Sequence, residues 1–282
     1  MKSHPFRIVN VFTHNGGALT GNPLCVFEDG AGLDTAVMQA LARQFNLSET
    51  TFILPSSRAE ARVRIFTPNY EMPFAGHPTL GTAHVCRALK LGGDSLRLEM
   101  QVGLIDVIAQ GDRWTLTAQP PTWRELDVPR SVLANALGIA ERDIGERPLW
   151  VKAGKEQLVV PLNSEEAVRR VAPRPLAMQS VRSEDGMSMA YVFAVNGGST
   201  ALARFFFPQG AAILEDPATG SATANLGGWC LAMQLPLPVA LQIAQGELVG
   251  RPSSLFLHVN AAGQIYVGGD VIEIGRGTIA LD

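Results

Sequence analysis

Short apolar runs dominate the chain, and Gly, Pro, Asn or Asp residues separate them. Runs of this length, some alternating and some continuous, are typical of β-strands. The strands that the pattern predicts are residues 6–12, 24–27, 51–54, 61–67, 95–100, 105–109, 114–118, 157–161, 190–195 and 203–207, with three more strand-like runs before the C-terminus.

Helical spacing of apolar residues occurs in fewer places. It is clearest in residues 34–45, where Asp34 is the expected N-cap and Met38, Leu41 and Phe45 share one face. The other predicted helices are 79–89, 131–137, a short helix capped by Asn163 with Glu166 three residues on, and a helix rich in small residues over 219–233. Because strands outnumber helices, the predicted fold class is α+β or mixed.

Length and local composition predict two lobes. The 282 residues exceed what one compact core usually takes. The run Gln119-Pro120-Pro121-Thr122 interrupts any regular element, because consecutive prolines lack donors and restrict their neighbours. We therefore expect an N-terminal lobe of residues 1–119, completed by a C-terminal strand at about 268–282, and a C-terminal lobe of residues 120–267.

Charge and composition narrow the class of protein. A net charge of −3 with scattered Lys and Arg residues argues against a nucleic-acid partner. No apolar run is long enough to span a membrane, and no signal segment is recognisable at the N-terminus, so a cytoplasmic location is expected. Cys25, Cys86 and Cys230 lie far apart in apolar stretches and are expected to be buried, reduced thiols.

A weak internal repeat links the two halves of the chain. Residues 64–68 (RIFTP) resemble residues 204–208 (RFFFP), and residues 71–78 (EMPFAGHP) are echoed by residues 215–222 (EDPATGSA). A chance similarity of small-residue runs also explains the match. If the repeat is real, two pseudo-symmetric lobes bring two helix N-termini to one cleft, where unpaired N–H groups bind a carboxylate without Lys or Arg.

The two repeated segments also hold most of the candidate functional residues, and each has a plainer explanation. Asp216 before Pro217 fits an N-cap followed by proline at the first helical position. His77 fits a loop or capping residue, and Ser221 fits a small helix residue. Glu49 lies in a polar turn, where a carboxylate is more often solvated than catalytic.

Several motifs together resemble the phenazine-biosynthesis PhzF-like isomerase and epimerase family, whose fold is like that of diaminopimelate epimerase. The motifs are Gly21-Asn22-Pro23 with Cys25-Val26-Phe27, Asn46-Leu47-Ser48-Glu49-Thr50, Phe66-Thr67-Pro68 with Ala75-Gly76-His77-Pro78, and residues 215–222. The resemblance spans the chain. It implies two similar lobes, each a mixed β-sheet curled around a central helix, with the active site in the cleft between them and a homodimer as the assembly.

The resemblance also implies roles for individual residues. Glu49 matches the general acid/base that removes and returns a proton. His77 and Asp216 match residues that hydrogen-bond polar groups of the substrate, and Gly76, Gly220 and Ser221 match helix-start groups that bind its carboxylate. Diaminopimelate epimerase has a cysteine at each helix start, whereas this chain has Ala75 and Ala218 in those regions. A proton shuttle by one carboxylate is therefore favoured over a two-thiol mechanism.

Other functions fit the sequence less well. No cluster of His, Cys or Glu completes a metal site, Ser221 is not in a Gly-x-Ser-x-Gly motif, and the Gly-rich loop of residues 14–22 lacks nucleotide-binding spacing. The resemblance therefore implies an isomerase that acts on a small carboxylate-bearing substrate, and we expect it to need no cofactor or metal. The alternative is a noncatalytic small-molecule-binding protein that kept the fold.

Overall fold

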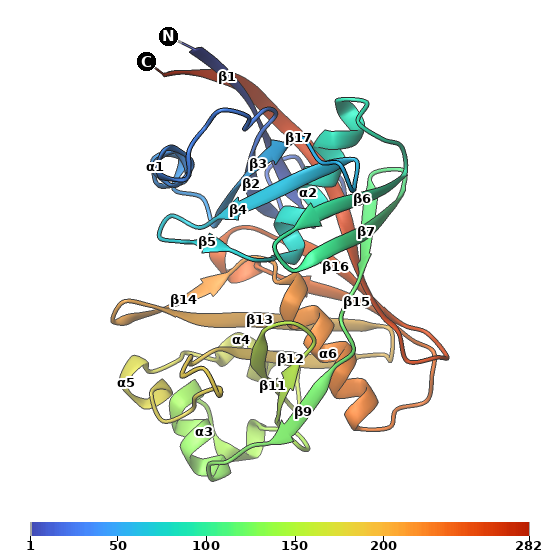
Figure 1. Ribbon diagram of the computed structural model, residues 1–282. Coiled ribbons are helices and arrows are strands. Elements are labelled where there is room, and N and C mark those ends of the chain that lie inside the picture. Colours follow the sequence, from blue (N-terminus) through green and yellow to red (C-terminus); the bar gives the residue numbers. More distant parts are fainter. Residues whose placement is uncertain (1, 282) are drawn as a thin grey trace. The chain divides into compact units, whose positions relative to one another are not determined.

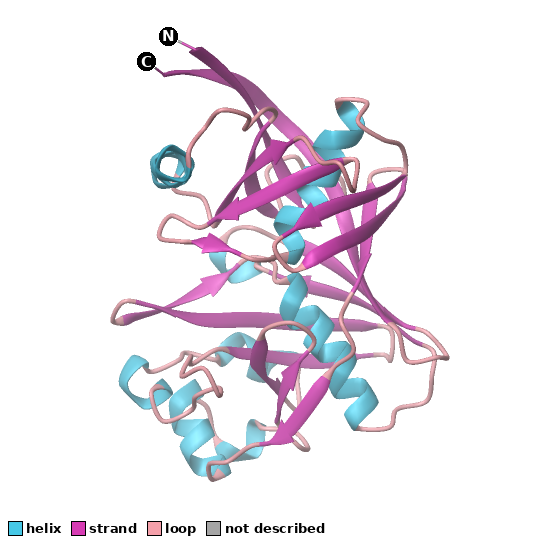
Figure 2. Ribbon diagram, viewed as in Figure 1, coloured by secondary structure: helices cyan, strands magenta, loops and turns pink. Residues whose placement is uncertain are grey.

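The computed structural model describes residues 2–281, which form mixed β-sheet with few helices (Figure 2). The chain divides into two compact units. One is formed by the residues up to Thr117 and from Gly268 onward, and the other by Ala118–Val267. Strand β17 (Ile265–Leu281) crosses the boundary between Val267 and Gly268. Its first three residues therefore belong to the second unit and the rest to the first.

The first unit is built on parallel and antiparallel strand pairs around helix α2. Strand β1 pairs with β2 and with β17, β2 pairs in parallel with β3, β3 is antiparallel to β4, and β4 is parallel to β6. Its elements are β1 (Lys2–Val11), β2 (Asn22–Phe27), α1 (Thr35–Phe45), β3 (Glu49–Leu54), β4 (Ala61–Phe66), β5 (Glu71–Met72), α2 (Gly76–Ala88), β6 (Ser95–Met100), β7 (Gly103–Gln110), β8 (Arg113–Thr117) and most of β17.

Helix α2 is buried along most of its length, because strands of its own unit contact it on several sides (Figure 1). The amphipathic helix α1 instead covers an aromatic cluster with one face. In that cluster Phe27 stacks on Phe52, with ring centroids 4.8 Å apart. Burying these apolar rings fixes β2 and β3 beside each other, and thereby fixes the first residue of β3.

The second unit repeats this plan with additional helices. Strand β11 is parallel to β12, β12 is antiparallel to β13, and β13 is parallel to β15. Its elements are β9 (Thr122–Glu125), α3 (Arg130–Leu137), the 3₁₀ turn η1 (Glu141–Asp143), β10 (Leu149–Lys152), β11 (Glu156–Pro161), α4 (Glu165–Arg170), α5 (Pro175–Met178), β12 (Ala190–Asn196), β13 (Thr200–Gln209), β14 (Ala212–Asp216), α6 (Gly220–Ala232), β15 (Val239–Gln245), the 3₁₀ turn η2 (Glu247–Val249) and β16 (Ser253–Val259).

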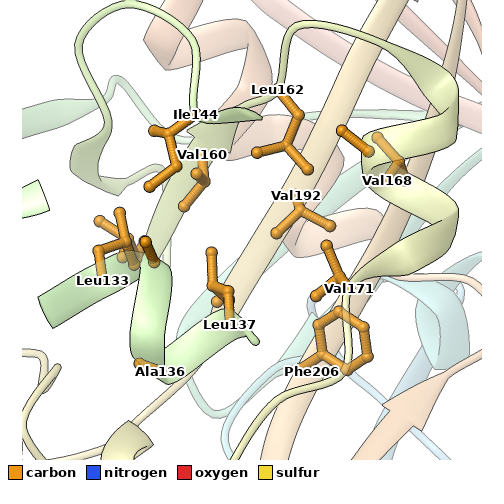
Figure 3. Close-up of a cluster of buried hydrophobic side chains, with 14 of the residues drawn as sticks. Leu133, Ala136, Leu137, Ile144, Val160, Leu162, Val168, Val171, Val192 and Phe206 are labelled. Carbon is orange, nitrogen blue, oxygen red and sulfur yellow. The ribbon is translucent and has the colours of Figure 1, made fainter. Parts of the chain in front are cut away.

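A second hydrophobic core lies between the sheet and the small helices of this unit. Figure 3 shows side chains of α3, such as Leu133 and Leu137, turned toward Val160 of β11 and Val192 of β12. Val168 of α4 closes the same cluster. These side chains are almost completely buried, so the packing of α3 and α4 on the sheet is stabilised by the hydrophobic effect.

Corresponding elements of the two units match in detail. Helices α2 and α6 each span 13 residues. Two positions after the last helical residue, each chain segment has a residue in the left-handed conformation: Lys90 after α2 and Gln234 after α6. The hairpins that precede the helices also match. Phe66 lies opposite Glu71 in one unit, and Phe206 lies opposite Glu215 in the other.

One ion pair occurs in both hairpins. Arg64 contacts Glu71 with two nitrogens, at 2.7 and 2.6 Å, and Arg204 contacts Glu215 at 3.1 and 2.6 Å. Each guanidinium also lies over a phenylalanine ring on its own strand. The Arg64 Cζ is 5.0 Å from the centroid of the Phe66 ring, and the Arg204 Cζ is 4.7 Å from that of Phe206. Each pair ties one strand of the hairpin to the short strand that leads into the buried helix.

Most predicted strands and helices are confirmed, with ends shifted by a few residues. Residues 95–100 form a strand as predicted, and Asp34 caps α1 by accepting a hydrogen bond from Val37 N–H. Of the predicted helix 79–89, residues 79–88 are helical, and α2 begins three residues earlier, at Gly76. Glu49 is not in the turn: it is the first residue of β3.

One predicted cap is wrong, and so is the plainer explanation of Asp216 as a cap. Ser164, not Asn163, caps α4 by accepting from Ala167 N–H, and the Asn163 amide donates instead to the carbonyl of Arg142. Asp216 is not the N-cap of the small-residue helix, because it is the last residue of β14 and Thr219 precedes α6. The short strands β5, β9, β10 and β14 were not predicted.

Across residues 2–281, no helix combines the length and the apolar character that crossing a membrane requires.

The buried ion pair of the second unit gives a stability prediction. Arg204 and Glu215 side chains are 11% and 9% exposed, and the Arg204 guanidinium also donates to the carbonyls of Val168 and Val171. Arg204→Met leaves the buried Glu215 carboxylate without its cation and the Val171 carbonyl without this donor, so we expect the free energy of unfolding to fall by about 3–5 kcal/mol. Denaturant unfolding measures this loss. The matched variant Arg97→Met removes a solvent-exposed ion pair with Asp106 and should leave the midpoint unchanged; equal midpoints for the two variants would contradict the prediction.

Candidate active site

Glu49 and His77 lie together in the first unit. Glu49 opens β3, and His77 is the second residue of α2. The His77 Nδ1 atom is 3.1 Å from Glu49 Oε2, and the two side chains are 6% and 16% exposed. The sequence separates these residues widely, and the packing of α2 against β3 brings them together.

Two buried polar atoms of the Glu49–His77 pair lack hydrogen-bond partners within residues 2–281. The contact between Nδ1 and Oε2 is short but lacks hydrogen-bond geometry, so Oε2 has no hydrogen-bond partner within residues 2–281. The other ring nitrogen of His77, Nε2, is also buried and without a partner there. A buried polar atom without a partner costs free energy, so its persistence suggests a task other than stabilising the fold.

The start of α2 adds backbone donors beside this pair. Gly76 and His77 are the first two helical residues, and no side chain caps the helix. The first N–H groups of a helix have no partner inside it, and they lie at the positive end of the helix dipole. A carboxyl group, an imidazole and free N–H groups therefore meet at one point, which can transfer a proton and hold an anionic oxygen.

Asp216, Gly220 and Ser221 belong to the second unit. Asp216 ends β14, and Gly220 and Ser221 begin α6, which also lacks a side-chain cap. The Thr219 hydroxyl donates a short hydrogen bond to the Asp216 carboxylate. This bond holds the carboxylate beside the helix start.

The buried side chain of Gln245, which the sequence did not point to, fixes this loop. Its amide nitrogen donates to the Asp216 carbonyl at 2.8 Å and to the Thr219 hydroxyl at 3.0 Å, and its amide oxygen accepts from Thr219 N–H at 3.3 Å. Gln245 lies at the end of β15, 26 residues beyond Thr219, so only the fold reveals the contact.

The position of Glu49 has a nonpolar counterpart in the second unit. In the first unit Thr50 pairs with Phe66, and in the second Ala190 pairs with Phe206. The residue before Thr50 is Glu49, and the residue before Ala190 is Met189. A thioether has no proton to transfer, so only the first unit carries a proton-transfer group at this position.

The three thiols are buried, and two of them lie far along the helices from their starts. Cys86 and Cys230 occupy the last turns of α2 and α6, at matching positions. Burial raises the pKa of Cys86 to about 12 and that of Cys230 to about 12, and it raises the pKa of Cys25 as well. A thiol with such a pKa is not ionised near neutral pH and is a poor nucleophile or base.

Comparison with known proteins gives the family. The model of the phenazine biosynthesis-like protein family, PhzC-PhzF, matches residues 9–274. The chain belongs to this family. It is 37% identical to an uncharacterized isomerase of Pasteurella multocida, over 98% of this chain and 94% of that protein. It is 35% identical to the trans-2,3-dihydro-3-hydroxyanthranilate isomerase of Pseudomonas chlororaphis, over 99% of this chain and 100% of that protein.

A solved structure supports the same fold. The crystal structure of a PhzF-family phenazine biosynthesis protein from Bacillus anthracis superposes with a TM-score of 0.87 over the full length of both chains, at 22% identity. The resemblance inferred from the sequence motifs is thus confirmed. The protein is an isomerase of the PhzF-like type.

A glycine behind the Asp216 loop gives a prediction on its geometry. A Cβ on Gly246 would lie 2.5 Å from the Pro217 carbonyl oxygen and 2.3 Å from that of Arg251, whereas a Cβ on Gly250 would meet nothing within 4 Å. Both glycines have positive φ, so alanine at either position costs about 1 kcal/mol of backbone strain. Gly246→Ala must also displace the loop, and we expect about 1–3 kcal/mol of further destabilisation.

Denaturant unfolding and amide NMR spectra of the two variants measure this difference. Gly246→Ala should shift the resonances of Asp216 and Thr219, and Gly250→Ala should leave them in place. Equal stability loss and unchanged loop resonances in both variants would show that the loop does not rest on Gly246.

The buried thiols give a separate prediction. Because their pKa values are raised and their side chains are buried, iodoacetamide should not label the folded protein near neutral pH. Mass spectrometry after denaturation in the same reagent should find three labels, one for each cysteine. Rapid labelling of the native protein would show that at least one thiol is accessible and reactive.

Proposed function

We propose that this protein is a cofactor-independent isomerase that moves a proton on a small carboxylate-bearing substrate, with Glu49 as the single acid/base. The observation that carries the proposal is the buried Glu49–His77 contact at an uncapped helix start. Two relatives support the proposal, because both are named as isomerases: the Pasteurella multocida protein and the Pseudomonas chlororaphis enzyme. We also propose that each unit is a lobe in which a mixed sheet curls around a central helix.

The proposed reaction needs no external reactant. The Glu49 carboxylate takes a proton from a C–H bond of the substrate, and the electron pair of that bond enters a neighbouring double-bond system. The protonated Glu49 then returns the proton to another carbon on the same face. No electrons leave the substrate, so the step consumes neither oxidant nor reductant. General acid–base catalysis of this kind contributes about 10²–10⁴ in rate.

His77 and the backbone of α2 would support this chemistry. The His77 imidazole lies beside the Glu49 carboxylate, and its buried Nε2, which has no partner within residues 2–281, can hydrogen-bond a polar substituent of the substrate. Free N–H groups of Gly76 and His77 would bind negative charge that builds up on the substrate carboxylate as the proton leaves. Met189 in the second unit, at the position matching Glu49, favours one proton carrier over a pair.

We also propose that Asp216, Gly220 and Ser221 are substrate-binding residues. The support for this assignment is the family resemblance and the rigid mounting of Asp216 by Thr219 and Gln245. The homodimer and the cytoplasmic location expected from the sequence stay predictions.

Deuterium exchange tests the proposed proton transfer. The native protein is incubated with trans-2,3-dihydro-3-hydroxyanthranilate in D₂O, and proton NMR follows both conversion and deuterium incorporation at carbon. We expect both with the native protein. In Glu49→Gln, which keeps the side-chain size, we expect the rate to fall by a factor of about 10²–10⁴.

The matched control is Glu141→Gln, a change of an exposed glutamate in the second unit that should leave the rate unchanged. Full exchange by Glu49→Gln would remove Glu49 from the mechanism. Tight binding of the compound by the native protein with neither conversion nor deuterium incorporation would instead identify a noncatalytic binding protein.

A further inference from the structure

A chain of buried amide groups ends on the Ser221 hydroxyl. Asn225 is one turn beyond Ser221 on α6, and Gln157 is on β11. The Asn225 amide nitrogen donates to Gln157 Oε1 at 2.8 Å, and Gln157 Nε2 donates to Ser221 Oγ at 3.0 Å. Asn225 is completely buried and Gln157 is 3% exposed, so water does not compete for these bonds.

Two backbone groups fix the direction of this chain. The Asn225 amide lies between Ala153 N–H, at 2.7 Å from Oδ1, and the Lys155 carbonyl, at 2.9 Å from Nδ2. A backbone N–H can only donate and a carbonyl can only accept, so the Asn225 amide has one satisfactory orientation. Its second N–H then requires the oxygen of Gln157, which leaves the Gln157 N–H group facing Ser221.

The fixed direction determines what Ser221 can do. Its oxygen accepts the bond from Gln157, so its own O–H must point elsewhere. Within residues 2–281 that O–H has no acceptor, and Ser221 is only partly buried. It lies in the first turn of an uncapped helix, among backbone N–H groups. The start of α6 therefore presents donors to a ligand, and these match an anionic oxygen better than an NH₂ group.

From this we infer that Gln157 is a positioning residue that fixes Ser221 as a hydrogen-bond donor and makes the start of α6 select a carboxylate over a carboxamide. The inference rests on the proposed function, because it takes Ser221 to be a substrate contact.

The first unit shows that the fold itself does not need the amide chain. Strand pairing places Leu24 at the position of Gln157. In the first unit Cys25 pairs with Thr50, and at the equivalent position of the second unit Leu158 pairs with Ala190. Leu24 and Gln157 are the residues just before Cys25 and Leu158. Along the helices, Gly81 takes the position of Asn225, and a Cβ on Gly81 would lie 2.6 Å from Leu24 Cδ2. An apolar contact thus fills the space that Gln157 and Asn225 fill with polar groups.

Binding of a matched pair of probes tests the inference. Calorimetry measures the dissociation constants of 3-hydroxyanthranilate and of its carboxamide, 3-hydroxyanthranilamide. We expect the native protein to prefer the carboxylate by about tenfold or more, as for a hydrogen bond to a charged group. Gln157→Glu, measured at alkaline pH where the new carboxyl is ionised, still accepts from Asn225 but also accepts the Ser221 O–H. We expect the preference to fall by about tenfold.

A double-mutant cycle separates this effect from simple charge repulsion. In a Ser221→Ala background, Gln157→Glu should change the preference far less, because no hydroxyl remains to be redirected. An equal change with and without Ser221 would show that the new charge acts directly, and it would overturn the inference. So would equal binding of the two probes by the native protein, including no binding of either.

A second variant, Gln157→Leu, tests the inference if Gln157→Glu does not fold. It copies Leu24 of the first unit and releases the Ser221 hydroxyl to donate or accept, so we expect a smaller fall in preference than with Gln157→Glu. An unchanged native preference in this variant would overturn the inference. These measurements detect binding and not turnover, so they remain informative if Glu49→Gln shows that Glu49 transfers no proton.

Discussion

An α-helix cannot pair its own first N–H groups, and neither α2 nor α6 receives a side-chain cap. In most helices a Ser, Thr, Asp or Asn side chain fills this role. Here Ala75 precedes α2, and the hydroxyl of Thr219 before α6 is directed to Asp216. The rest of each unit holds these open helix starts in place, through the Arg–Glu pairs of the preceding hairpins and the strands packed along each helix.

The two units show how one backbone plan carries different chemistry. Where the first unit has Glu49, the second has Met189, and where the first has His77 at the second helical position, the second has Ser221. The apolar contact of Leu24 is replaced by the amide of Gln157. Each exchange keeps the strand pairing and changes only a side chain. Proton transfer is thereby confined to one unit in our proposal, and a rigid set of hydrogen-bond donors to the other.

The sequence predicted elements well where the signal was local and poorly where it came from distant contacts. Apolar periodicity located α1 and its cap at Asp34, but two neighbouring polar residues competed for the α4 cap and Ser164, not Asn163, had the right geometry. Nothing in the turn before β3 marked Glu49, which only the family motif singled out. Gln157 was missed because its partner Ser221 lies 64 residues away, and pairing across that distance has no signature in local composition.

Strand β17 has a consequence for how the protein is made. It pairs with β1 from Lys2 opposite Leu281 to Val11 opposite Val271, so the first unit needs both ends of the chain, whereas the second is one continuous segment. During synthesis on a ribosome, all of Ala118–Val267 is available before β17 can reach its partner. The unit that begins the sequence is therefore the last to be completed, and until then β1 presents an open edge to other chains.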